Sequence, residues 1–93
     1  AFLKHERPCG IILFARNCAG GDQIRTLVAD AKAAIGREHV LVLIDQEGGR
    51  VQRLRPPLAR TLPPAAAYAA LYAGNPAKAR EAAFHVARLV AAE

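Results

Sequence analysis

Two continuous apolar runs, separated by one amphipathic segment, dominate the first half of the chain. The runs are "GIILFAR" at residues 10–16 and "VLVLI" at residues 40–44. Neither alternates apolar with polar residues, which is typical of strands covered on both faces. The segment between them, residues 22–36, predicts a helix that Asp22 caps and Gly36 ends. Its apolar residues recur at helical spacing: Ile24, Leu27, Val28, Ala31 and Ile35.

Strand, helix and strand within about 35 residues is the spacing of a βαβ unit with parallel strands. Strands that need cover on both faces favour an α/β fold, either an open doubly wound sheet or a closed barrel. Two strands have four apolar faces, and about three helices do not cover them. We therefore expect residues 1–93 to form part of a single larger α/β domain.

The second half of the chain begins with a loop and ends in helices. Four prolines frame an arginine-rich stretch for which we expect irregular structure, and long ordered loops are usually functional. A short helix is predicted over "PPAAAYAALYAG", residues 63–74, with Gly74 as its stop. A longer helix is predicted from Asn75, its cap, through Pro76 in the first turn to the last residue. The opening "AFLKHERP" resembles the tail of another helix.

Composition indicates a globular protein with a basic surface. Hydrophobic residues make up 53% of the chain, and 13 Lys and Arg against 8 Asp and Glu leave a net charge of +5. This charge fits either an anionic partner such as nucleic acid, bound by the Arg50 to Arg60 loop, or a locally basic part of a larger protein. No aromatic residue interleaves with these arginines, so the base-stacking side chains of a nucleic-acid site are missing.

The chain carries no sign of a membrane span, metal site or disulfide. No apolar run approaches the roughly 18 residues that a membrane helix needs, and we expect a cytoplasmic protein. A strand between Cys9 and Cys18 would hold them too far apart for a disulfide, so two free thiols are expected. The histidines are scattered and lack metal-ligand spacing. We expect neither metal nor cofactor.

Candidate chemistry lies where the second strand ends, in "LVLIDQEGGRVQRLRPP". Asp45 follows the strand directly, and ligands of parallel α/β folds bind at the carboxyl ends of strands. A carboxylate there can accept hydrogen bonds from sugar hydroxyls, or it can simply cap the turn. Glu47 raises the possibility of a catalytic carboxylate pair, although acids two residues apart need not converge. Arg16 and Asn17, at the end of the first strand, are either pocket wall or a cap.

The loop after Asp45 contains two glycines and four arginines. Gly48 and Gly49 permit a tight turn and a close approach of ligand to backbone. One or two of the arginines are candidates to face a ligand, and the others to remain solvated: Arg50, Arg53, Arg55 and Arg60.

Familiar motifs of other enzyme classes are absent. Four apolar residues followed by Asp45 resemble the magnesium-binding strand of phosphate-loop NTPases, but no G-x-x-x-x-G-K-[ST] occurs. No G-x-G-x-x-G follows a strand, and the chain has no serine, which excludes a serine nucleophile within it.

The order "GIILFARN", helix, "LIDQEGGRVQRLR" and "LPPAAA" resembles the N-terminal part of bacterial β-N-acetylhexosaminidases of glycoside hydrolase family 3. The resemblance spans nearly the whole chain and implies a segment of a (β/α)8 TIM-type barrel roughly two to four times this length. It implies that Asp45 and Arg53 bind the terminal N-acetylglucosamine of peptidoglycan fragments, as a small-molecule carbohydrate substrate, in a monomeric enzyme.

The resemblance also implies retaining hydrolysis through a covalent glycosyl-enzyme. The nucleophilic aspartate and the histidine with its partner aspartate have no match in these 93 residues, and we identify no catalytic residue here. We therefore expect residues 1–93 alone to be inactive.

Overall fold

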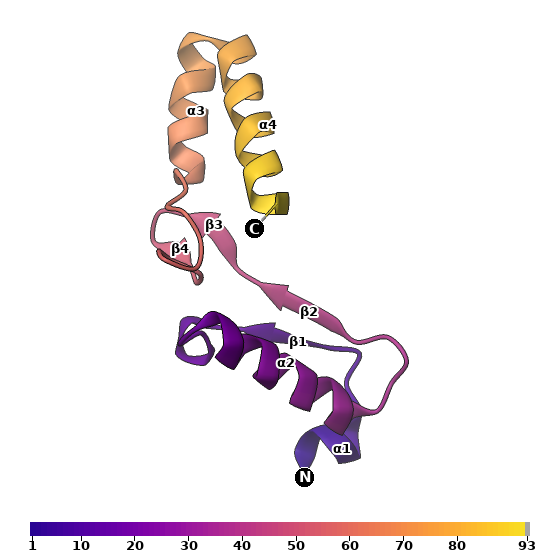
Figure 1. Cartoon of the computed structure of the whole chain (residues 1–93). Helices are drawn as coiled ribbons and strands as arrows, with labels where there is room; N and C mark the ends of the chain where they lie inside the picture. Colours follow the sequence, from indigo (N-terminus) through magenta and orange to yellow (C-terminus); the bar gives the residue numbers. More distant parts are fainter. Residues whose placement is uncertain (93) are drawn as a thin grey trace. The chain divides into compact units, whose positions relative to one another are not determined.

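The computed structural model describes residues 1–92, which form two compact units divided between Asp45 and Gln46 (Figure 1). The first unit contains α1 (Phe2–Glu6), β1 (Gly10–Leu13), a short 3-10 helix η1 (Ala15–Asn17), α2 (Gly21–Ile35) and β2 (Leu41–Ile44). The second contains β3 (Gln46–Gly48), β4 (Val51–Gln52), α3 (Ala65–Gly74) and α4 (Pro76–Ala92).

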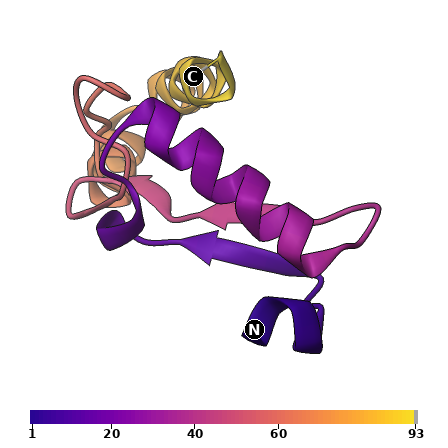
Figure 2. The same cartoon turned by 60° about the horizontal axis from the view of Figure 1, so that its bottom comes forward.

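The first unit is the predicted βαβ arrangement. Strands β1 and β2 pair in parallel, from Gly10 opposite Leu41 to Leu13 opposite Ile44. A Cβ atom at Gly10 would lie 2.8 Å from the Cβ of Leu41, so the strands approach more closely here than another residue would allow. Figure 2 shows α2 lying along the two strands. The βαβ prediction is confirmed.

Strand β1 is shorter than the apolar run predicts. The run continues to Arg16, but the strand ends at Leu13. Asn17 accounts for the difference, because its Oδ1 accepts a hydrogen bond from the Phe14 backbone N–H at 3.0 Å, while its own N–H donates to the Phe14 carbonyl. These local bonds compete with the strand ladder and wind Ala15–Asn17 into the 3-10 turn. Cys9 and Cys18 are free thiols, as expected.

Helix α2 follows its apolar stripe, but its start differs from the prediction. Ala31 and Ile35 are buried on it, with Ile35 only 1% exposed. Gly36 ends the helix in the left-handed conformation, as predicted. Asp22 does not cap the helix, because the helix already begins at Gly21 and Asp22 lies in the first turn, paired with Arg25.

Strand β2 keeps much of its apolar surface exposed within the described residues. Leu41 is 63% exposed and Leu43 is 51% exposed. Residues 1–92 therefore leave part of the apolar strand surface uncovered, in agreement with the expectation that about three helices do not cover four strand faces. The physical reason is that a single crossover helix covers one face of a two-stranded sheet and leaves the other bare.

The second unit opens with a β-hairpin where irregular structure was expected. Strands β3 and β4 pair antiparallel through Gln46 opposite Gln52. The sequence did not predict this hairpin, because its strands are too short to show an alternation of apolar and polar residues. The loop that follows contains a cis Pro56–Pro57 peptide bond.

Two helices complete the second unit and form a helical hairpin (Figure 1). Asn75 caps α4 as predicted, since its Oδ1 accepts a hydrogen bond from the Lys78 N–H at 3.0 Å. Helix α3 ends at Gly74, the last residue of the predicted range, but begins at Ala65, after the two prolines that were predicted to start it. The buried apolar residues of this unit are Ala59, Leu62 and Ala79.

Candidate ligand-binding segment after the second strand

Asp45 occupies the position that the sequence predicts for it. It follows the last residue of β2 directly and is half-buried. Because Leu13 pairs with Ile44, the chain leaves both parallel strands at the same edge of the sheet, where Phe14 and Asp45 come next. This is the edge at which parallel α/β folds bind ligands.

The two candidates at the end of β1 have different roles. Asn17 acts as a cap, the second of its two predicted roles, since its side chain accepts a hydrogen bond from the Phe14 N–H. Arg16 is exposed, and its guanidinium carbon lies 4.8 Å from the centroid of the Phe14 ring, in the range of a cation–π contact. Asn17 is therefore part of the βα turn, and Arg16 presents a stacked cation beside it.

The glycine pair is the turn of the β3–β4 hairpin. Gly48 and Gly49 have φ angles of 90° and 61°, a region that favours glycine. A Cβ at Gly48 would collide with the Pro63 carbonyl oxygen, and one at Gly49 would lie 2.8 Å from the Pro64 Cβ. Residues 62–64 thus pass directly over the turn. Their close approach leaves no room for a side chain at Gly48 or Gly49.

Two glutamines hold the loop that the sequence describes only as arginine-rich. Gln46 Oε1 accepts hydrogen bonds from the N–H groups of Arg53 and Leu54, each at 3.0 Å, and Gln46 Nε2 donates to the Leu54 carbonyl at 2.9 Å. Gln52 is only 2% exposed and bonds the backbone at three points. Sequence reasoning missed both residues. The available signal was a pair of amides flanking a glycine turn.

The arginines of the loop differ in burial. Arg53 is half-buried, and its backbone N–H is held by Gln46. Arg50, Arg55 and Arg60 are exposed. The Arg55 side chain extends back toward the turn, and its Nη2 lies 3.4 Å from the Gly49 carbonyl oxygen. Arg53 is thus the least solvated of the four arginines. It lies in the second unit, whereas Asp45 ends the first.

Glu47 is exposed, in contrast to the half-buried Asp45 two residues earlier. Within residues 1–92 there is no group of three His, Cys, Asp or Glu side chains that could hold a metal ion. In the same described part of the chain, no helix is long and apolar enough to cross a membrane.

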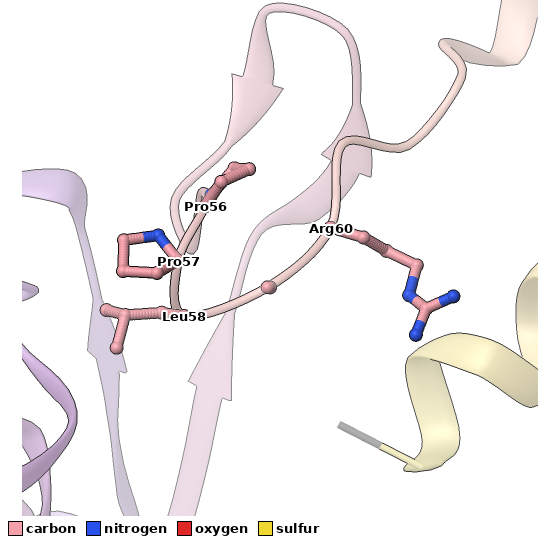
Figure 3. A pocket seen from close by; sticks show the side chains of 5 residues that line it. Pro56, Pro57, Leu58 and Arg60 are labelled. Atoms are coloured by element: carbon pink, nitrogen blue, oxygen red, sulfur yellow. The ribbon is translucent and has the colours of Figure 1, made fainter.

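A shallow pocket of about 390 Å³ lies in the loop itself (Figure 3). Its lining residues are Pro56, Pro57, Leu58, Ala59 and Arg60. Figure 3 shows the Arg60 side chain extending away from the side on which Pro57 and Leu58 lie. No carboxylate is among these lining residues, so the pocket offers no charged acceptor for sugar hydroxyls.

Comparison with known proteins identifies relatives along nearly the whole chain. The chain is 44% identical over 91 residues to the protein named Beta-hexosaminidase of Alkalilimnicola ehrlichii. This match covers 98% of this chain and 26% of the relative. The chain is 44% identical over 92 residues to the Beta-hexosaminidase of Xanthomonas euvesicatoria pv. vesicatoria, and 42% identical to that of Stenotrophomonas maltophilia. Each of these two matches covers 99% of this chain and 27% of the relative.

No protein-family model matches the chain, and no solved structure matches it. The parallel βαβ unit, followed along the chain by a glycine-turned hairpin, is a segment of the α/β type. More specifically, the chain is homologous to the bacterial proteins named Beta-hexosaminidase and spans about a quarter of their length.

Proposed function

We propose that this chain is a substrate-binding part of a β-N-acetylhexosaminidase of glycoside hydrolase family 3. The complete enzyme removes terminal β-linked N-acetylglucosamine from peptidoglycan-derived fragments in the bacterial cytoplasm. The observation that carries the proposal is identity of 41–44% to proteins named Beta-hexosaminidase over 98–99% of the chain. The position of Asp45 at the carboxyl edge of β2 supports it.

The proposed fold of the complete protein is a (β/α)8 barrel in which β1 and β2 are neighbouring strands. The parallel register and the crossover helix α2 support this proposal, because a barrel repeats this unit. The exposed apolar side chains of β2 support it as well, since further barrel elements would cover them. In such a barrel Asp45 would stand at the face where substrates bind.

The proposed division of labour follows from the chemistry of the two site residues. The Asp45 carboxylate accepts hydrogen bonds from vicinal sugar hydroxyls, and the Arg53 guanidinium donates to sugar oxygens in a fixed planar geometry. Both interactions orient the sugar ring relative to the bond that is cleaved. The nucleophile and the acid–base group of a retaining mechanism lie in other parts of the complete enzyme.

The test compares two adjacent acids in the complete enzyme. Asp45→Asn retains the shape of the side chain but loses its charge, and Glu47→Gln makes the same change two residues away at an exposed position. Activity is measured on an aryl N-acetyl-β-glucosaminide, with the folded state of each variant verified by circular dichroism.

We expect Asp45→Asn to lower kcat/KM by about 10- to 150-fold, because a hydrogen bond to a charged group contributes about 1.5–3 kcal/mol. Glu47→Gln is expected to stay within about twofold of the original enzyme, as surface substitutions usually do. Equal kcat/KM values for Asp45→Asn and Glu47→Gln would refute the assignment of Asp45.

A further inference from the structure

The side-chain amide of Gln46 binds backbone groups of two consecutive residues, Arg53 and Leu54. Its Oε1 accepts from the N–H groups of Arg53 and Leu54, both at 3.0 Å, and its Nε2 donates to the Leu54 carbonyl at 2.9 Å. Three bonds from one side chain fix the backbone on either side of the Arg53 Cα. Arg53 and Leu54 lie beyond the strand ladder, because β4 ends at Gln52.

Gln52 secures the far side of the same loop. Its Nε2 donates to the carbonyls of Leu54, at 2.9 Å, and Arg60, at 2.8 Å. Its Oε1 accepts from the Leu62 N–H at 3.0 Å. The Leu54 carbonyl is therefore shared by Gln46 and Gln52, and the buried Gln52 amide ties residues 54, 60 and 62 together.

The two glutamines differ in what they hold. Gln52 connects three segments of the loop and has the burial of a structural residue. Gln46 is half-buried, and its side chain bonds the backbone of Arg53 and Leu54. An arginine side chain has several rotatable bonds, so its guanidinium reaches a ligand reproducibly only when its backbone is fixed.

We propose that Gln46 is a positioning residue for Arg53, holding its backbone so that the guanidinium meets the substrate. This inference rests on the proposed function, in which Arg53 binds the sugar. Gln46 acts through Arg53 and does not itself touch substrate. Its removal consequently weakens substrate binding only as far as Arg53 contributes to that binding.

The experiment is a double-mutant cycle in the complete enzyme. Gln46→Met keeps the side-chain volume and removes all three hydrogen bonds. It is combined with Arg53→Ala, and kcat and KM are measured for the single and double variants on an aryl N-acetyl-β-glucosaminide. Gln46→Glu keeps the acceptor and loses the donor, and it replaces Gln46→Met in the cycle if that variant does not fold.

Gln23→Met is the matched control. Gln23 also makes two bonds from its amide to backbone groups, accepting from the Ala19 N–H at 2.9 Å and donating to the Asn17 carbonyl at 3.0 Å. It belongs to the first unit and holds the loop after η1. A general cost of removing a loop-tethering glutamine would appear equally in this variant.

We expect Gln46→Met to lower kcat/KM by about tenfold, chiefly by raising KM, since a misplaced Arg53 weakens the binding of substrate and transition state alike. The kcat/KM of Gln46→Glu is expected to lie between those of Gln46→Met and the original enzyme. The kcat/KM of Gln23→Met is expected to equal that of the original enzyme. In the Arg53→Ala background, Gln46→Met is expected to change kcat/KM by less than about twofold, because interacting residues are not additive.

Two results would overturn the positioning role while leaving the proposed function intact. One is a Gln46→Met variant with unchanged kcat/KM although Arg53→Ala is impaired. The other is an effect of Gln46→Met that is equally large in the presence and absence of the Arg53 side chain, which indicates a purely structural role. If Arg53→Ala itself leaves kcat/KM unchanged, the role of Arg53 in the proposed function fails, and with it this inference.

Discussion

A methyl group at Gly48 tests the hairpin geometry directly. The φ angle of 90° at Gly48 is one that residues with a Cβ rarely adopt. In Gly48→Ala the new Cβ would collide with the Pro63 carbonyl oxygen and lie 2.9 Å from the Leu62 carbonyl oxygen. The Leu62 carbonyl cannot retreat freely, because it accepts a hydrogen bond from the Gly49 N–H at 3.0 Å.

The expected cost has two parts. Holding alanine at this φ costs about 1–3 kcal/mol. Moving residues 62–63 away from the new methyl group breaks the hydrogen bond between the Leu62 carbonyl and the Gly49 N–H, a further loss of about 0.5–1.5 kcal/mol. We therefore expect Gly48→Ala to lower the free energy of unfolding of the complete protein by about 1.5–4.5 kcal/mol.

The measurement is urea unfolding of the complete protein, analysed by linear extrapolation. Gly74→Ala is the matched control, since Gly74 lies in the last turn of α3 and its Cβ would meet no atom within 4 Å. This control is expected to be neutral or to stabilise by up to about 1 kcal/mol. Equal stability of the Gly48→Ala and Gly74→Ala variants would refute the close approach over the turn.

Further expected outcomes concern helix ends, activity and charge. Asn75→Ala removes the oxygen that binds the Lys78 N–H, and urea unfolding is expected to show a loss of about 1 kcal/mol, whereas no loss would argue against the cap. Gly36→Ala places a side chain at φ 63°, so we expect a loss of about 1–2 kcal/mol in the same assay; a neutral result would contradict the left-handed C-cap. The 93-residue chain alone is expected to release no aryl alcohol from an aryl N-acetyl-β-glucosaminide, and measurable turnover would place catalytic groups within it. Fluorescence anisotropy at low salt is expected to show no binding of single-stranded DNA or RNA, and a salt-sensitive affinity would restore the nucleic-acid alternative.

Sequence reasoning succeeded where structure depends on neighbouring residues. The amphipathic stripe identified α2, and Gly36 and Asn75 were correctly assigned to helix ends. Asp45 was correctly placed after the second strand. These features follow from periodicity and from the conformational preferences of single residues, which are visible along the chain.

Sequence reasoning failed where several local signals compete. Asp22 and Gly20 both stood near the start of α2, and the helix begins after Gly20. The apolar run of β1 ends early because Asn17 bonds the Phe14 N–H. In the second case a side-chain bond to the backbone competes with the strand ladder, and periodicity along the chain does not reveal it.

The sequence by itself determined the βαβ order, the end of α2 at Gly36, the cap of α4 at Asn75 and the position of Asp45 directly after a strand. Only the tertiary structure decided that residues 62–64 pass over the glycine turn and that Gln46 and Gln52 bind the arginine loop. The physical reason is that an amide side chain bonds whichever peptide groups the folded chain brings within reach. No spacing along the sequence specifies that Gln46 meets the backbone of Arg53, because the hairpin must form first.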